Sequence, residues 1–363
     1  MAITLWITTL TMGMLPPSGF PPLLWHIHAM LFGFVPAAIA GFLLTALPNW
    51  TGRPPVSGPL LGLLAELWLL GRIASFVSAD IPSWAAIGAD AAFLFALAAV
   101  VARELIASGN RRNFPIIVPI TVLAIANLMM DLALEGDPGL ADVGWRLGLA
   151  AILILVSVIG GRIVPAFTRN WLLVRKAETL PAPPGRFDQI ALALLHTSLV
   201  AWVLWPAARL EGVALLCAGA LNLGRLARWR AGATRSEPLL LVLHVGYGWL
   251  ALGVAALGFS LIDPALPASA AIHALTVGAV GTMILAVMTR VTRGHTGHEL
   301  SADLATILIY GLIFLAAVAR IAAEFASQAY ARLLLLAAAA WVGAFGLFLL
   351  RYAPMLLRPR RRG

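Results

Sequence analysis

Apolar residues fill most of the chain in long runs that short polar segments separate. Each run is about 20 residues long, which is the length a helix needs to cross roughly 30 Å of hydrocarbon. Proline and glycine stand at nearly every junction between runs, for example at Pro16-Pro17 and Pro54-Pro55. The pattern therefore predicts about twelve transmembrane helices, near residues 2–15, 22–47, 57–78, 81–103, 114–135, 143–167, 188–206, 210–229, 238–258, 267–291, 302–323 and 328–351.

The composition supports this interpretation, because 61% of the 363 residues are hydrophobic and only 11% are charged. Such a balance excludes a soluble globular domain of this length. We predict an all-α, polytopic membrane helix bundle in which residues 1–363 form a single transmembrane domain. Cys217 is the only cysteine, so the chain has no internal disulfide, and without a C-x-x-C-H motif any haem is held without thioether bonds.

The net charge of +9 would suit nucleic-acid binding in a soluble protein. Here the basic residues gather in alternate short loops and in the C-terminal tail, so we expect membrane lipid and no nucleic acid as the partner. Arg111 and Arg175 belong to the basic loops, whereas Asp80, Glu135 and Asp263 belong to the intervening ones. Since Lys and Arg mark the cytoplasmic side, both termini are predicted to be cytoplasmic and the acidic loops to lie outside.

Four of the seven histidines fall inside apolar runs: His26, His28, His244 and His273. An ionisable side chain in hydrocarbon costs about 3 kcal/mol or more and normally faces the bundle interior, and imidazole is a common ligand of haem iron and copper. The predicted span directions place His26, His28 and His273 roughly 6–9 Å below the outer surface. His244 lies about 9 Å from the cytoplasmic face, where His295 follows the tenth span.

Helix geometry limits what these histidines can bind together. Residues at i and i+2 point to nearly opposite sides of a helix, so His26 and His28 cannot share one ion unless the helix is irregular there. We predict that His28 and His273 hold a haem between two helices, which leaves His26 for a second metal or a haem propionate. His244 and His295 are predicted to form an inner metal or haem site. The alternative is that these imidazoles only hydrogen-bond neighbouring helices.

Carboxylates inside the predicted spans support a competing function. Glu66, Asp90, Asn127 and Asp131 are predicted to line the interior. There the carboxylates and the histidines would serve a proton-coupled transporter, or these groups would hydrogen-bond neighbouring helices. No internal repeat of the kind that builds many transporters is evident. His196 is predicted to be structural and His298 to lie in a solvated turn.

Four stretches of the chain are distinctive as motifs, and they are Trp25–Phe34, Pro48–Pro54, Gly160–Trp171 and His273–Gly297. Together they span most of the chain and resemble the NnrS family of haem- and copper-containing membrane proteins. The resemblance implies haem, copper, an inner-membrane location, and defence against nitric oxide in a denitrification context. Turnover of nitric oxide, binding and sensing all stay open, and a redox partner is not identified. Two departures are that Ala29 stands where the family usually has Glu and that the N-terminus is shorter than usual.

A more distant likeness concerns the second span. The stretch from His28 to Gly41 resembles the second helix of haem-copper oxidases, whose histidine binds low-spin haem from the outer side. The chain has no counterpart of the three-histidine copper site of those oxidases, so oxygen or nitric oxide reduction by their mechanism is not expected. For the inner layer, we expect Arg162, Arg169 or Arg290 to neutralise haem propionates or another anion.

Overall fold

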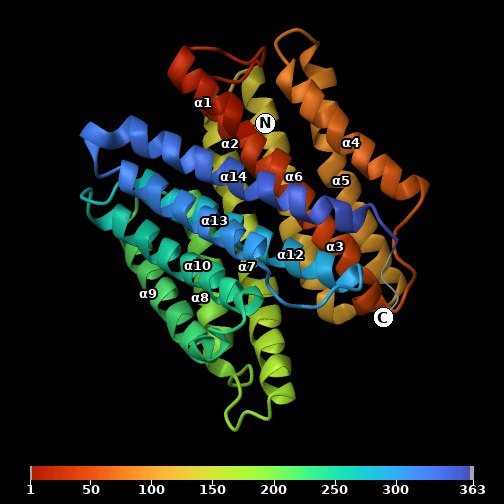
Figure 1. Ribbon diagram of the computed structural model, residues 1–363. Helices are drawn as coiled ribbons and strands as arrows, with labels where there is room; N and C mark the ends of the chain where they lie inside the picture. The colour runs from red at the N-terminus through yellow and green to blue at the C-terminus, as the bar shows by residue number, and fades with distance from the viewer. Residues whose placement is uncertain (1, 360–363) are drawn as a thin grey trace. The chain divides into compact units, whose positions relative to one another are not determined.

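The computed structural model describes residues 2–359, in which every regular element is a helix and there is no strand. Eleven helices in this part of the chain are long and apolar enough to cross a membrane (Figure 1). The chain is therefore a multi-pass membrane protein, as the run lengths predict. It divides into two compact units, Met1–Ile152 and Leu153–Gly363, which we call the first and second unit.

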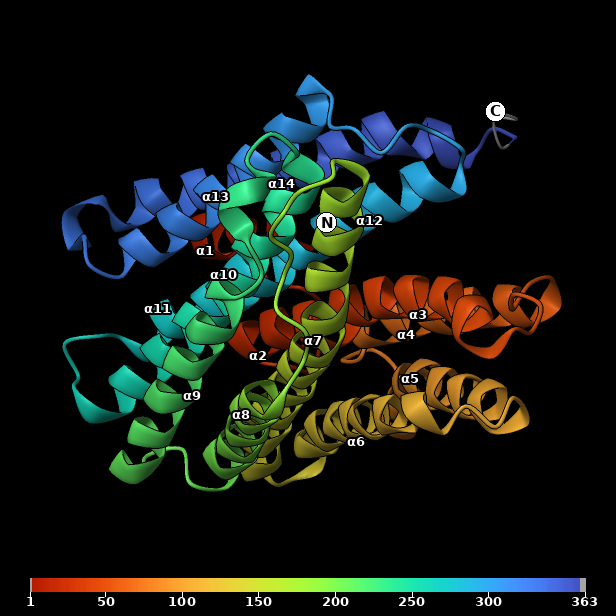
Figure 2. The ribbon, with the colours of Figure 1, turned by 90° about the horizontal axis from the view of Figure 1, so that it is seen from below.

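In the first unit, α4 and α5 pack side by side, and α5 also contacts α3 and α6 (Figure 2). Leucine and isoleucine side chains on the outer faces, such as Leu69 and Ile73 of α4, are about half exposed and suit contact with lipid. The helices are α1 (Ala2–Met12), α2 (Pro22–His28), η1 (Ala29–Phe34), α3 (Val35–Thr51), α4 (Pro59–Phe76), α5 (Ser83–Ala107), η2 (Arg111–Ile116), α6 (Ile117–Leu132), η3 (Ala133–Glu135) and the start of α7 (Pro138–Val174).

In the second unit, glycines bring α9 and α10 close together. A Cβ on Gly258 would lie 2.5 Å from the backbone oxygen of Gly212, so only a glycine fits there. Such small residues are typical where membrane helices pack backbone to backbone. After the end of α7 come α8 (Arg186–Leu204), α9 (Arg209–Ala227), η4 (Ala231–Thr234), α10 (Pro238–Ile262), α11 (Ala268–His273), η5 (Ala274–Gly281), α12 (Thr282–His295), α13 (Leu304–Ala323), η6 (Ser327–Ala329) and α14 (Tyr330–Leu356).

Eleven of the twelve predicted spans coincide with long helices, and the first does not. The helix at that position, α1, has 11 residues and is about 16 Å long at 1.5 Å per residue. That length is well short of the roughly 30 Å hydrocarbon layer. The prediction of a span near residues 2–15 is corrected to a short apolar helix.

Two spans contain a π-helical segment directly after a histidine. In the first unit α2 ends at His28 and η1 follows, and in the second unit α11 ends at His273 and η5 follows. Each π-helix then continues as an α-helix. Such insertions are rare and frequently stand at functional sites, so this irregularity singles out both histidines.

The two histidine segments also share a sequence pattern. Ile-His-Ala occurs at 27–29 and at 272–274, and a glycine follows the histidine after five residues, at Gly33 and Gly278. A left-handed glycine ends each segment 24 residues after its histidine (28 to 52 and 273 to 297), with φ of 68° at Gly52 and 74° at Gly297. The two π-helical segments therefore share a local sequence pattern that involves only a few positions.

Candidate metal centre

The imidazole of His28 is fully buried in the first unit. Proline at position 22 starts α2, whose last residue is His28, and the ring stacks on Phe20 with centroids 4.8 Å apart. Phe32 of η1 lies on it as well, at 5.6 Å. The Nδ1 atom is 3.3 Å from the hydroxyl of Ser75 on α4. These contacts fix the plane of the ring and direct Nε2 away from Ser75.

Two carboxylates from different helices meet the other ring nitrogen. Asp90 comes from α5 and Asp131 from α6, and both are at least 96% buried. The Nε2 atom of His28 lies 3.1 Å from Oδ2 of Asp90 and 3.4 Å from Oδ1 of Asp131. Despite these distances, Nε2 has no hydrogen-bond partner, and neither has Oδ2 of Asp131. The three groups are close together, but Nε2 of His28 makes no hydrogen bond to either carboxylate.

This spacing suits a shared metal ion. Two donors at about 2.1 Å from a zinc-sized ion are roughly 3.0–3.4 Å apart, depending on the coordination angle. One ligand atom from each of the three residues lies within 4.8 Å of the others. Within residues 2–359 this is the one such grouping of histidine, cysteine and carboxylate side chains. We call it the His28–Asp90–Asp131 cluster.

Neighbouring polar groups hold Asp90 in place. Arg72 of α4 donates to Oδ1 of Asp90, while the side-chain amide of Asn127 donates to Oδ2 at 2.8 Å. A Cβ on Gly33 would lie 2.5 Å from the Arg72 guanidinium, so the glycine of the π-helix makes room for that arginine. Supporting partners of this kind orient metal ligands and raise affinity.

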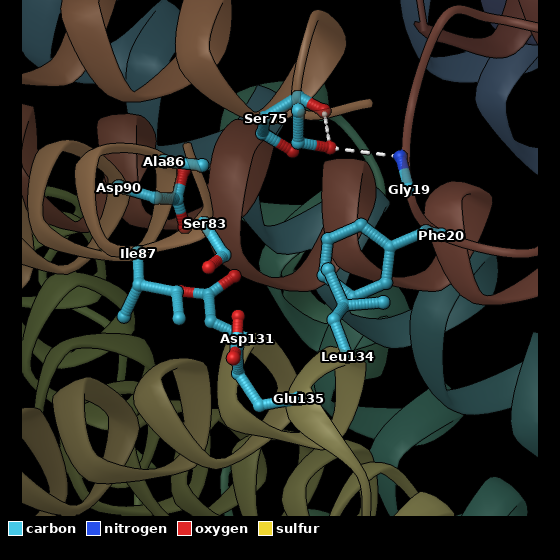
Figure 3. Close-up of a pocket in the computed structure, with 11 residues that line it drawn as sticks. Gly19, Phe20, Ser75, Ser83, Ala86, Ile87, Asp90, Asp131, Leu134 and Glu135 are labelled. Carbon is cyan, nitrogen blue, oxygen red and sulfur yellow. Dashed lines mark hydrogen bonds between the residues drawn. The ribbon is translucent and has the colours of Figure 1, made fainter. Parts of the chain in front are cut away.

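The cluster borders a cavity of about 180 Å³ at one end of the helices. Among the side chains that line it, Asp90, Asp131 and Ser75 are buried and Glu135 is exposed (Figure 3). Pockets for drug-sized ligands are larger, roughly 300–1,000 Å³. The cavity therefore suits water, a small ion or a diatomic molecule better than a macrocycle.

The other predicted outer histidines have different surroundings. His26 stacks on Trp6 with ring centroids 4.7 Å apart. In the second unit, Nδ1 of His273 lies 2.7 Å from the backbone oxygen of Ser269. A carbonyl only accepts, so this nitrogen carries the proton and Nε2 of His273 is the basic one. His28 and His273 belong to different units, so their pairing around one haem stays a prediction.

The predicted inner histidines do not join a described metal grouping. His244 is buried on α10, where Nε2 is 2.9 Å from the hydroxyl of Thr168 and Nδ1 has no hydrogen-bond partner. His295 is the last residue of α12 and is exposed. His196 hydrogen-bonds Ser157 at 2.8 Å, in keeping with a structural role.

Only two of the three carboxylates that were predicted to line the interior do so. Asp90 and Asp131 meet in the cluster, whereas Glu66 is exposed on α4. Asn127 is buried beside Asp90, as predicted for the interior, whereas the role of Arg72 and the joining of the aspartates to His28 were not predicted. All of these residues lie near the predicted outer ends of their spans, so the sequence places them in one layer but does not show which of them meet.

Comparison with known proteins gives one clear result. A family model described as NnrS protein matches residues 1–360, which is nearly the whole chain. No curated protein matches the chain.

Proposed function

Since this chain belongs to the NnrS family, we propose that it is a metal-binding inner-membrane protein that protects the cell against nitric oxide. The nitric-oxide role and the inner membrane are implied by the family resemblance of the sequence motifs. The eleven long apolar helices support a protein that works within a bilayer. The metal-binding part of the proposal rests on the His28–Asp90–Asp131 cluster.

One observation carries the proposal: Nε2 of His28 faces two buried carboxylates at 3.1 and 3.4 Å without a hydrogen bond. Arg72 offsets the charge of Asp90, but burying the second carboxylate beside it is costly unless a further cation is present. Imidazole and carboxylate donors suit divalent copper, zinc or iron, and the cluster has no sulfur ligand of the kind that favours Cu(I). Copper, which the resemblance implies, fits as the divalent ion and would supply one-electron redox chemistry.

Within such a centre, the chain's own groups have separate roles. Nδ1 of His28 would donate its proton to Ser75, which leaves the Nε2 lone pair for the metal. Asp90 would bind through Oδ2 while Arg72 occupies its other oxygen. Phe20 and Phe32 shield the imidazole and exclude water from that side.

Haem fits His273 better than His28. An axial histidine usually donates Nδ1–H to a carbonyl and binds iron through Nε2, and His273 has this arrangement with Ser269. At His28, by contrast, Nε2 faces two carboxylates and Nδ1 faces a serine hydroxyl. We therefore propose His28 for the metal ion and His273 for haem. His26, His244 and His295 remain weaker proposals as ligands, because no described grouping includes them.

Metal analysis and a visible spectrum of the purified protein test the proposal. Wild type should contain a transition metal and show a Soret band. His28→Ala and the isosteric Asp131→Asn should lose the metal ion and keep the Soret band, whereas His273→Ala should lose or shift that band. Glu66→Gln is the matched control, because it removes an exposed carboxylate from α4. Wild-type metal content in both cluster variants would refute the assignment.

A proton-coupled transporter is the second candidate, and the acidic cavity beside Asp90 and Asp131 favours it. Buried carboxylates next to a water-sized space are common in proton relays. Colourless, metal-free protein that acidifies proteoliposomes in response to a substrate gradient would support the transporter over the metalloprotein.

A further inference from the structure

The cavity beside the His28–Asp90–Asp131 cluster joins buried and exposed carboxylates. Asp131 lines the cavity and belongs to the cluster, as does Asp90. Glu135 also lines it, one helical turn beyond Asp131, and is exposed. Figure 3 shows Glu135 and Asp131 on neighbouring turns with Asp90 opposite them. The carboxylates thus form a series from the surface to the buried imidazole.

Hydroxyl groups supply the other polar wall. Ser75, Ser78 and Ser83 line the cavity from the end of α4 and the start of α5. The Ser78 hydroxyl accepts a hydrogen bond from the backbone N–H of Gly19 at 2.9 Å, so the wall is anchored to the chain before α2. Three hydroxyls and three carboxylates provide oxygen atoms that can replace water molecules around a cation. The lining includes no Lys, Arg or His side chain.

A second observation points to a cation as the occupant. Asp131 lines this space, and its buried Oδ2 has no hydrogen-bond partner. Nε2 of His28 also makes no hydrogen bond, although it lies 3.1 Å from Oδ2 of Asp90. Unpaired buried acceptors are rare because each costs about 1–3 kcal/mol. A positive ion at the inner end would satisfy both atoms and, unlike a water molecule, would also offset the negative charge of the carboxylates.

We propose that this cavity is the access route by which a hydrated divalent cation reaches the His28–Asp90–Asp131 cluster, with Glu135 as the first carboxylate it meets. The route opens at the face formed by the segments after α4 and after α6, which the charge pattern predicts to be the outer one. The proposal rests on the proposed metal-binding function and adds the ligand class, the path and the side of loading. Acidic side chains at a narrow opening raise the local cation concentration and select against anions.

Stopped-flow loading of metal-depleted protein tests the route, with Co²⁺ as an optical probe. Glu135→Gln should slow association about 3- to 10-fold at low ionic strength, and salt should reduce the difference. Ser83→Phe should slow loading by narrowing the cavity. Both variants should reach the wild-type Co²⁺ stoichiometry, since neither residue is a cluster ligand. Asp137→Asn is the matched control, because it removes an exposed carboxylate two residues from Glu135 that does not line the cavity.

The outcomes separate the two proposals. Wild-type loading rates in both Glu135→Gln and Ser83→Phe, with full stoichiometry, would overturn the route and leave the metal centre intact. Equal slowing by Asp137→Asn would also overturn it, because a general surface charge would then be sufficient. A wild-type protein that binds no Co²⁺ at equilibrium would overturn the metal centre and the route with it. Glu135→Gln keeps the test valid if Ser83→Phe does not fold, since Glu135 is exposed.

Discussion

Replacing Asp131 by Asn distinguishes a metal centre from a structural ion pair. The substitution keeps the size of the side chain and removes one buried charge. If His28 were protonated and no metal were bound, Asp131 would attract it across 3.4 Å, which is worth about 5 kcal/mol at an effective dielectric constant of about 20. Asp90 would repel Asp131 by at least about 3.5 kcal/mol at the 4.8 Å limit of the cluster.

Without metal, the net electrostatic stabilisation that the Asp131 charge provides is therefore small. The attraction to His28 exceeds the repulsion from Asp90 by at most about 1.5 kcal/mol, and taking the Asp131 carboxylate out of water costs several kcal/mol. The charge of Asp131 should not stabilise the metal-free protein, so Asp131→Asn should leave its melting temperature unchanged or raise it. With metal bound, Asp131→Asn should instead lower the melting temperature, because the variant lacks one of the metal ligands.

The size of that reversal follows from binding linkage. Loss of a direct ligand should weaken metal binding by at least about 100-fold, since even supporting residues matter 10- to 100-fold. At a metal concentration of about 100 times the wild-type Kd, metal stabilises wild type by about 2.7 kcal/mol and the variant by only about 0.4 kcal/mol. Tryptophan fluorescence melts of both proteins, with Co²⁺ and with chelator, measure the difference.

The control and the refuting result are clear. Glu66→Gln should keep the full metal-induced rise in melting temperature, because Glu66 is exposed outside the cluster. If Asp131→Asn lowered the melting temperature equally with metal and with chelator, the cluster would be a structural ion pair and our reasoning would be wrong.

Three further predictions concern the second unit. Gly258→Ala should destabilise the folded protein by about 1–3 kcal/mol through overpacking. Gly248→Ala should be tolerated, because its Cβ would meet only a side chain at 3.5 Å, and thermal melts compare the two variants. Tyr352→Phe should cost about 1–3 kcal/mol, because Nε of the buried Arg293 loses its hydrogen bond and Thr306 loses one of its two side-chain partners. Tyr330→Phe, at an exposed position, should cost little in the same assay. Burial would raise the pKa of Asp303, but hydrogen bonds from a threonine and two nearby arginines outweigh it and hold the pKa well below its usual range. The ionised Asp303 should therefore stabilise the folded protein fully above about pH 4, and this stabilisation should be lost as the pH falls further. A melting temperature of Asp303→Asn that fell as steeply with acid as that of wild type would contradict this.

The number and kind of helices could be predicted from sequence because bilayer thickness sets the length of an apolar run. Eleven spans followed from run length and from proline and glycine at the junctions. The first span was wrong, since an 11-residue apolar helix resembles the edge of a longer one. The π-helices after His28 and His273 could not be predicted, because one extra residue in a turn leaves the apolar pattern almost unchanged.

The sequence by itself determined that buried imidazoles and carboxylates must face the interior of a helical membrane protein, because hydrocarbon offers them no hydrogen bonds. It singled out His28, Asp90 and Asp131 one at a time. Only the tertiary structure decided that these three residues form one cluster. Their helices, α2, α5 and α6, are far apart in the chain, and helix rotation within a bundle depends on close packing at positions such as Gly33, where a side chain would displace the arginine that holds Asp90.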